Sequence, residues 1–243
     1  MIFVGTHHKT GSVLFYNVFS GIAKALSLHF YSGPQSKLPP GAQIWFSEHS
    51  LLYARDFTEI TGLHVIRHPL EVICSAYRYH LVCKELWCIE NRPSRFVRHL
   101  DLGGLTYQER LRSLPLREGI LFEMRGASFA TIMDMYRWNY ADERFLNVKL
   151  EDTAADFDAT FARIFSFLGV DEEECLPLAI RHDVGRTAPE QLELMPHVTN
   201  KSRRSVTWPE YFSDGEMLDV FRLAFPADLL QKLNYPPPKS VTA

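Results

Sequence analysis

The stretch IFVGTHHKTGSV, residues 2–13, decides the fold class of this chain. Residues 2–4 are apolar and predict a short buried strand, residues 5–11 predict a polar turn, and residues 12–28 carry apolar side chains at helical spacing. A loop between a buried strand and a helix directs backbone N–H groups and the positive end of the helix dipole at one place. Gly11 lets the backbone approach an oxyanion, Lys9 adds a full charge and Ser12 adds a hydroxyl donor. The stretch therefore predicts a site for a phosphate or a sulfate.

The residue order in this loop differs from that of a Walker A loop. That pattern needs a second glycine five residues after the first, followed by Lys and then Ser or Thr. Here Thr10 stands five residues after Gly5, and Lys9 precedes Gly11 instead of following it. A nucleotide-dependent kinase would also need a magnesium-binding Asp at the end of an apolar strand, and the sequence has no such strand. A kinase therefore stays an alternative that the loop order disfavours.

Apolar runs alternate with helical patterns along the rest of the chain, which is typical of an α/β domain with a mainly parallel sheet flanked by helices. Further strands are predicted at residues 43–46, 63–66 and 145–150, and helices at 69–80, 128–141, 155–168, 172–181, 217–225 and 227–233. We expect a single domain over residues 1–235, with a helical cap or acceptor region at about 81–127. Residues 236–243 begin with three prolines and predict a disordered tail.

Composition excludes several classes of partner. The net charge of −3 over 243 residues gives no reason to expect nucleic acid or an anionic membrane. The sequence has neither a signal-peptide pattern nor about 18 consecutive apolar residues. None of the four cysteines stands in a CxxC pair, so reduced thiols in a cytoplasmic protein without a bound metal are the simplest interpretation.

A second candidate anion site is LHVIRHPLEVICSAY, residues 63–77. Arg67 follows an apolar strand, and ligands of open parallel sheets bind at the carboxyl ends of the strands. The guanidinium group has the geometry to bind a phosphate. A helix that begins at Pro69 would bring Ser75 back over the same edge after about two turns.

Together these motifs resemble the PAPS-dependent sulfotransferase family, where PAPS is 3′-phosphoadenosine-5′-phosphosulfate. The order Lys-Thr-Gly-Ser after the first strand is similar to the family's 5′-phosphosulfate loop, and Arg67 with Ser75 matches its 3′-phosphate element. The resemblance implies a P-loop-like sulfotransferase architecture, no metal, and PAP as the product. It assigns cofactor binding to Lys9, Thr10, Gly11, Ser12, Val13, Arg67, Ser75, Arg203 and Arg204.

The chain departs from the family pattern at several positions. The basic segment 200–204 precedes Trp208 as in the family, but it lacks the usual glycine, and the choice between Arg203 and Arg204 stays open. Leu150 replaces a tyrosine that contacts the cofactor in many members, and Val13 replaces a second loop hydroxyl. A non-catalytic nucleotide-binding protein is therefore a further alternative.

The catalytic residues are Lys9, His49 and Glu48 in this interpretation. Lys9 would neutralise charge on the leaving phosphate. The segment WFSEHS, residues 45–50, ends the second predicted strand and resembles the family's Lys-Thr-His segment, which places His49 as the base. Glu48 is the rival, as in several carbohydrate sulfotransferases, and strand alternation should turn only one of the two toward the cleft.

We expect sulfuryl transfer from PAPS to an acceptor hydroxyl or amine, on a small molecule or a carbohydrate. The sequence does not identify the acceptor or the oligomeric state. The aromatic residues of the cap would either line an acceptor pocket or form core, and core is the more frequent role: Tyr77, Tyr79, Trp87, Phe96 and Tyr107.

Overall fold

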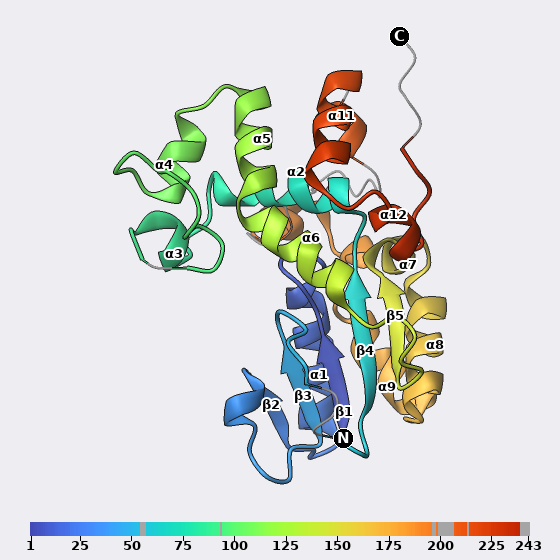
Figure 1. Ribbon diagram of the computed structural model, residues 1–243. Helices are drawn as coiled ribbons and strands as arrows, with labels where there is room; N and C mark the ends of the chain where they lie inside the picture. Colours follow the sequence, from blue (N-terminus) through green and yellow to red (C-terminus); the bar gives the residue numbers. More distant parts are fainter. Residues whose placement is uncertain (54–56, 93, 196–197, 199–206, 213, 239–243) are drawn as a thin grey trace. The chain divides into compact units, whose positions relative to one another are not determined.

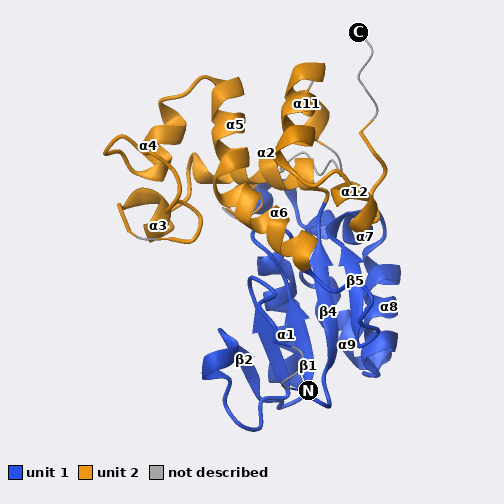
Figure 2. Ribbon diagram, in the orientation of Figure 1, with its two compact units in different colours: residues 1–67, 138–192 blue, residues 68–137, 193–243 orange. Residues whose placement is uncertain are grey.

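A computed structural model describes the chain except residues 54–56, 93, 196–197, 199–206, 213 and 239–243. Its residues form two compact units that are interleaved along the sequence (Figure 2). The first unit comprises Met1–Arg67 and Trp138–Leu192, and the second comprises His68–Arg137 and Glu193–Ala243. The predicted cap at 81–127 lies wholly in the second unit. Most of the tail predicted at 236–243 lies outside the described residues.

The first unit contains a five-stranded sheet in the order β2-β3-β1-β4-β5 (Figure 1). Its strands are β1 (Ile2–Gly5), β2 (Phe30–Ser32), β3 (Ile44–Ser47), β4 (Thr61–Ile66) and β5 (Phe145–Lys149). Every neighbouring pair is parallel. The predicted α/β class with a mainly parallel sheet is therefore confirmed, and β2 is an edge strand that the sequence did not predict.

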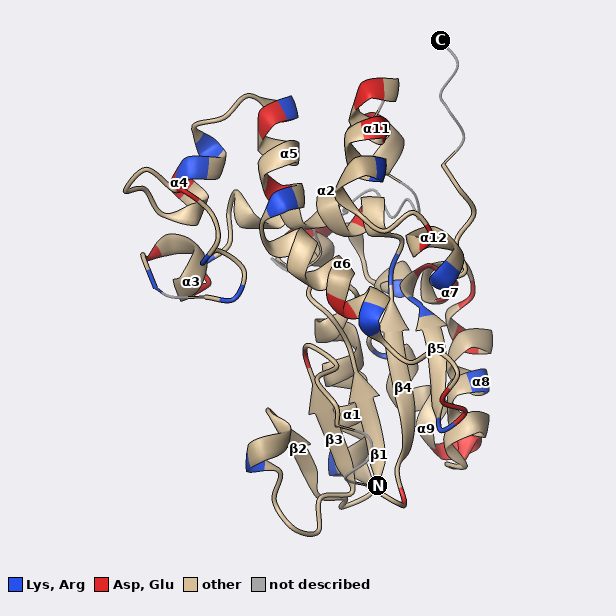
Figure 3. Ribbon diagram, viewed as in Figure 1, with Lys and Arg blue, Asp and Glu red and all other residues tan. Residues whose placement is uncertain are grey.

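The central strands contain no charged residue, because both faces of the sheet are covered. Strands β1, β3 and β4 have neither Lys, Arg, Asp nor Glu, and they are uniformly tan in Figure 3. Parallel strands that are buried on both faces have such continuous apolar runs. Charged side chains are instead found mainly on the helices and loops.

One face of the sheet packs against helices α1 (Ser12–Ala25), α8 (Phe157–Leu168) and α9 (Glu172–Ile180). Alternate strand residues such as Val4, Phe46 and Leu63 meet the apolar sides of these helices. Helix α8 begins at the cap Asp156, whose carboxylate accepts a hydrogen bond from the backbone N–H of Ala159 at 3.0 Å. This cap separates α8 from α7 (Leu150–Ala155), so the single helix predicted from residue 155 begins two residues later.

The opposite face of the sheet carries large aromatic residues. Phe3 and Trp45 are fully buried, with ring centroids 5.0 Å apart. Phe145 and the ring of Trp138 also pack against Phe3. The first unit is completed by η1 (Gln35–Lys37), η3 (Val184–Arg186) and most of α10 (Pro189–Glu193).

The second unit is helical and is organised around α2 (Pro69–His80), which has the limits that the sequence predicted. All residues of α2 except Arg78 are buried. The other helices of this unit are α3 (Leu86–Ile89), α4 (Tyr107–Arg112), α5 (Leu116–Arg125), α6 (Ala127–Arg137), η4 (Trp208–Glu210), α11 (Gly215–Ala224) and α12 (Leu229–Lys232). No helix among the described residues is long and apolar enough to cross a membrane.

A buried polar network fixes the interior of the second unit. The carboxylate of Glu123, which is fully buried, accepts hydrogen bonds from Tyr107 and Ser128 and pairs with His80, each at 2.8 Å. A buried charge is tolerated where its oxygens are all hydrogen-bonded in this way. Tyr107 also packs at 5.4 Å from Trp87, so the cap aromatics Tyr79, Phe96 and Tyr107 are core residues, with Trp87 half-buried beside them.

Candidate functional site

The carboxyl ends of three neighbouring parallel strands carry most of the predicted site residues. The loop with Lys9 follows β1, Glu48 and His49 follow β3, and Arg67 follows β4. The register pairs Gly5 with Ser47 and with His64, so these strands end at nearly the same level. This edge is where open α/β sheets bind ligands.

The loop after β1 is shaped by hydrogen bonds among its own residues. The hydroxyl of Thr10 accepts from the backbone N–H of His7 at 2.8 Å and donates to the carbonyl of His7 at 3.0 Å. The Ser12 hydroxyl donates to the same carbonyl at 3.0 Å and lies 2.9 Å from the hydroxyl of Thr6. Thr6 and Thr10 are fully buried. The hydroxyls of Thr10 and Ser12 thus stabilise the loop conformation.

Backbone conformation explains the glycine of the loop. Gly11 has φ +97°, a left-handed conformation that L side chains rarely adopt, and it is the N-cap residue of the 14-residue helix α1. A Cβ at this position would lie 2.7 Å from Cδ1 of Leu150. Lys9 also has a positive φ, +65°, which is uncommon outside glycine and is often found at functional sites. Leu150, where the family pattern has a tyrosine, fills the space beside Gly11.

Arg67 is directly connected to this loop. Its guanidinium Nη1 donates to the carbonyl oxygen of Lys9 at 3.2 Å. Lys9 and Arg67 are both half-buried. The structure therefore brings together the Lys9 and Arg67 segments that the sequence placed 58 residues apart. Val13, in the first turn of α1, is 40% exposed.

Two buried histidines, His7 in the loop after β1 and His64 in β4, lie in contact; the sequence favoured a hydrogen-bonded structural role for His7 and did not single out His64. His7 Nε2 lies 2.8 Å from His64 Nε2, and His64 Nδ1 lies 2.9 Å from Oδ1 of Asn147. Burial lowers the pKa of His64 to about 3, against the opposing effect of its hydrogen bond to Asn147, so His64 is neutral at ordinary pH. Because the Asn147 oxygen accepts from Nδ1–H, Nε2 of His64 is an acceptor and His7 donates to it. The His64 ring stacks on Trp138 at 4.1 Å.

Glu48 and His49 lie in a turn and not in the strand. Strand β3 ends at Ser47, and the backbone N–H of Ser50 donates to the Ser47 carbonyl at 3.4 Å. The expectation that strand alternation separates the two candidates is therefore wrong, because neither continues the pleat. They differ in burial instead, since Glu48 is exposed and His49 is half-buried. The turn is tied to the loop after β1, because the Ser50 hydroxyl donates to the Thr6 carbonyl at 3.0 Å.

The remaining predicted residues belong to the second unit. Ser75 lies on α2 and is 1% exposed. Glu71, on the same helix, accepts hydrogen bonds from the backbone N–H groups of Thr207 and Trp208 and from the Thr207 hydroxyl. Helix α2 thereby holds Thr207 and Trp208, which stand three and four residues after the end of the basic segment 200–204. Arg203 and Arg204 themselves lie outside the described residues.

No protein-family model and no curated protein matches the sequence. Among solved structures, the chain is similar to mouse sulfotransferase SULT7A1 complexed with PAP, with 16% identity, a TM-score of 0.57, and coverage of 97% of this chain and 85% of that one. Retinol dehydratase in complex with androsterone and inactive cofactor PAP is 13% identical, with a TM-score of 0.47 and coverage of 95% and 80%. The sulfotransferase domain of the Synechococcus PCC 7002 olefin synthase is 16% identical, with a TM-score of 0.45 and coverage of 98% and 95%.

The first of these likenesses establishes the fold. The chain has a parallel α/β architecture in which a loop leads from its first strand into the N-terminus of helix α1. That architecture is the sulfotransferase fold, as the sequence motifs predicted.

Proposed function

We propose that this chain is a sulfotransferase that moves a sulfuryl group from PAPS to an acceptor hydroxyl or amine and releases PAP. One observation carries the proposal: on the sulfotransferase fold, the loop with Lys9 is hydrogen-bonded to Arg67 at the carboxyl edge of the sheet. Two cationic residues and a helix N-terminus at one edge provide electrostatic binding of an anion. The sequence order of both motifs supports PAPS as that anion.

In this proposal, the loop after β1 binds the 5′-phosphosulfate. Backbone N–H groups at the start of α1 and the Lys9 ammonium would contact its oxygens, with Gly11 allowing their close approach. Lys9 would also offset the charge that builds on the oxygen bridging phosphorus and sulfur as the sulfuryl group leaves. The hydroxyls of Thr10 and Ser12 would contribute to binding by stabilising the loop conformation. Val13 would contribute as part of the first turn of α1, where the backbone N–H groups contact the anion.

Arg67 and Ser75 would bind the 3′-phosphate, together with Arg203 or Arg204. The arginine fork binds two phosphate oxygens at once, which a lysine cannot do. Glu71 supports this assignment, because it fixes Thr207 and Trp208, which stand three and four residues after Arg204.

For the base that takes the acceptor proton, we propose His49. It follows β3, the strand next to β1, and imidazole has the ordinary pKa that best suits proton abstraction near neutral pH. Glu48 is the alternative base and is the more exposed of the two. The acceptor would be a small molecule or a carbohydrate, and a cytoplasmic location stays a prediction from cysteine usage.

The proposal is tested by thermal unfolding with PAP and with adenosine 5′-phosphate, which lacks the 3′-phosphate. PAP at 100 times its dissociation constant should add about 2.7 kcal/mol to the free energy of unfolding. Arg67→Ala should weaken PAP by about 1.5–3 kcal/mol and the analogue much less, because only PAP carries the phosphate that Arg67 would bind. The absence of any stabilisation by PAP would refute the proposed function.

Transfer itself is measured with labelled PAPS in the presence of a magnesium chelator. Lys9→Ala should abolish it, and Lys24→Ala should not, because Lys24 is an exposed lysine at the other end of α1. Near-native turnover of Lys9→Ala would show that the loop assignment is wrong. Turnover that is lost when the chelator removes magnesium would favour a kinase-like enzyme.

A further inference from the structure

An asparagine of strand β5 is connected to the loop after β1 through two buried histidines. Oδ1 of Asn147 lies 2.9 Å from Nδ1 of His64, and Nε2 of His64 lies 2.8 Å from Nε2 of His7. His64 is fully buried and His7 is 1% exposed. His64 belongs to β4, which lies between β1 and β5 in the sheet. A chain of hydrogen bonds therefore runs across the sheet, from β5 to the loop that carries Lys9.

The chemistry of these groups fixes the direction of both hydrogen bonds. An amide oxygen only accepts, so Nδ1–H of His64 donates to Asn147. Burial lowers the pKa of His64 to about 3, so its ring carries one proton at neutral pH and its Nε2 is an acceptor. Nε2–H of His7 donates to that acceptor. Asn147 thus determines that His64 presents an acceptor to His7.

Aromatic packing fixes the orientation of the His64 ring. The ring stacks on Trp138, with a centroid distance of 4.1 Å and an interplanar angle of 12°. Tyr140 contacts the same ring edge-on, with a centroid distance of 5.5 Å. A rotation of the His64 ring would lose both the stacking and the hydrogen bond to Asn147, so one orientation is favoured. The position of the acceptor nitrogen that faces His7 is therefore well defined.

His7 is the residue around which the loop after β1 closes. Its backbone N–H donates to the hydroxyl of Thr10 at 2.8 Å. Its carbonyl accepts from the hydroxyls of Thr10 and Ser12, each at 3.0 Å, and from the backbone N–H of Thr10 at 3.1 Å. Ser12 is the first residue of α1. A shift of His7 would therefore disturb the start of the helix, whose backbone N–H groups are those proposed to contact the 5′-phosphosulfate.

We propose that Asn147 and His64 are positioning residues of the anion site: they hold His7, and through it the loop after β1, in the conformation that binds the 5′-phosphate end of PAPS. The inference rests on the proposed function, since it adds residues to the same site. Asn147 acts through His64, and His64 acts through His7. Without the Asn147 acceptor, His64 would carry its proton on Nε2, and two N–H donors would then face each other. The His7 ring would have to move.

Isothermal titration calorimetry of the full chain with PAP and with adenosine 5′-phosphate tests the proposal. Asn147→Leu is similar in shape but has no acceptor, and it should weaken both ligands by about two- to tenfold, the equivalent of one lost hydrogen bond. The weakening should be equal for the two ligands, because both carry the 5′-phosphate, whereas Arg67→Ala should discriminate between them. Unchanged affinity of Asn147→Leu for both ligands would overturn the proposal.

His64→Phe is a second variant, because phenylalanine can keep the stacking on Trp138 while both hydrogen bonds are lost. It should weaken both ligands at least as much as Asn147→Leu does. The double variant should bind as His64→Phe alone does, because Asn147 acts only through His64, and additive losses would contradict this.

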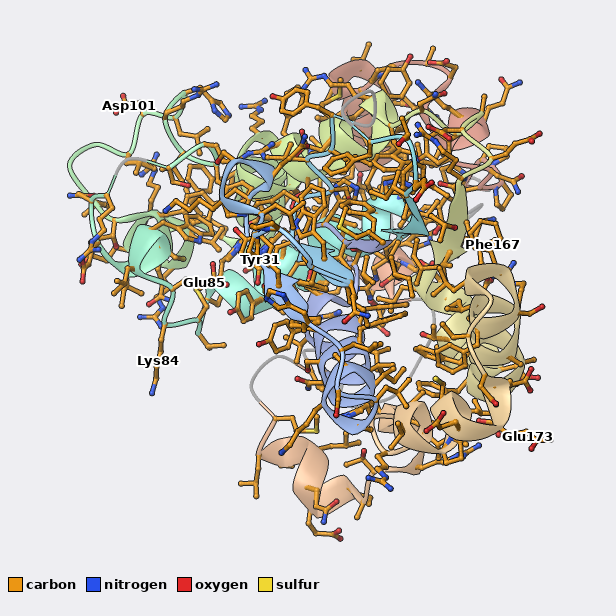
Figure 4. All side chains as sticks on the ribbon, turned by 90° about the horizontal axis from the view of Figure 1, so that it is seen from below. Tyr31, Lys84, Glu85, Asp101, Phe167 and Glu173 are labelled. Atoms are coloured by element: carbon orange, nitrogen blue, oxygen red, sulfur yellow. The ribbon has the colours of Figure 1, made fainter. Side chains whose placement is uncertain are left out.

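His29→Phe is the matched control, and it should bind both ligands as the wild type does. His29 is exposed and directly precedes β2, at the end of the sheet where the parallel strands begin. Figure 4 views the sheet from that end, with Tyr31 of β2 labelled. The loop after β1 follows the opposite ends of the strands. Circular dichroism of each variant confirms that the titrations report a folded chain.

Heteronuclear NMR of the histidine ring nitrogens gives a readout that a merely structural role would not move. The His64 signals are identified by their loss in His64→Phe. In the wild type, Nδ1 of His64 should carry the proton, and in Asn147→Leu the proton should be on Nε2. A proton that stays on Nδ1 in Asn147→Leu would overturn the proposal.

The outcomes separate this inference from the proposed function. A wild type that binds neither PAP nor adenosine 5′-phosphate would refute the proposed function, wherever the His64 proton lies. A wild type that binds both, with Asn147→Leu binding them equally well, would refute the positioning role alone.

Discussion

Gly11→Ala is the substitution whose cost follows most directly from the structure of the loop. An L residue held in a left-handed conformation costs about 1–2 kcal/mol, and Gly11 has φ +97°. The new Cβ would lie 2.7 Å from Cδ1 of Leu150. Since that atom ends a flexible side chain, Leu150 can rotate away at about 0.5–1.5 kcal/mol. Alanine also has fewer conformations than glycine in the unfolded chain, and this difference stabilises the folded state by about 0.4–1 kcal/mol. We expect a net loss of about 2 kcal/mol of unfolding free energy.

The assay is urea unfolding followed by circular dichroism. Gly169→Ala is the matched control, because Gly169 has φ +65° but no atom within 4 Å of its Cβ position. Gly169→Ala should lower the free energy of unfolding by about 1 kcal/mol or less, because only the cost of the left-handed backbone conformation applies and no side chain has to move. Combining Gly11→Ala with Leu150→Ala should cost less than the sum of the two single losses, because the contact has been removed. A Gly11→Ala chain as stable as the wild type would refute the reasoning.

Three further predictions follow from burial, sheet geometry and chemistry. The pKa of His64 is about 3 in the folded chain and about 6.5 in the unfolded chain, so the contribution of neutral His64 to stability is present above pH 6.5 and is lost as the pH falls toward 3. Between pH 6.5 and 5 the wild type should therefore lose about 2 kcal/mol of unfolding free energy that His64→Phe does not lose. Urea unfolding at each pH measures this difference. Gly62→Ala should lower the free energy of unfolding by more than about 3 kcal/mol, because its Cβ would lie 2.1 Å from a backbone carbonyl oxygen of β1. Gly21→Ala, in helix α1, should instead raise the free energy of unfolding by about 0.5–1 kcal/mol. Equal melting temperatures for the two variants would contradict this prediction. His49→Ala should cut turnover by about 10² to 10⁴ with PAP affinity within a few-fold, and Glu48→Gln should be mild; the reverse pattern would identify Glu48 as the base.

The local parts of the fold could be predicted from the sequence. The strand, loop and helix of residues 2–25 lie in order along the chain, and their periodicity is strong. The start of α2 followed from Pro69, because proline favours the first turn of a helix. Strand β2 has only three residues and lies at the edge of the sheet, so it carries too little pattern to be recognised.

The supports of the candidate site could not be predicted, because they join residues far apart in sequence. His7 and His64 are 57 residues apart, and His64 and Asn147 are 83 apart. Their contact arises from the order of strands in the sheet, which periodicity does not reveal. The interleaving of the two units has the same origin. The orientations expected for Glu48 and His49 were wrong for a local reason: strand β3 ends at Ser47, so both residues lie in the turn that follows and strand alternation does not apply to them.

The pairing of β4 with β5 has a consequence for how the chain is made. Strand β4 ends at Ile66, and β5 begins at Phe145, after the whole helical segment between them. A ribosome that adds about 5–20 residues per second needs roughly 4–16 seconds to synthesise the intervening stretch. During that interval the nascent sheet has an open edge, with apolar Leu63 and Val65 beside its unpaired backbone. An open edge of this kind is a template for pairing with other chains. The growing polypeptide therefore depends, for some seconds, on whatever shields that edge in the cell.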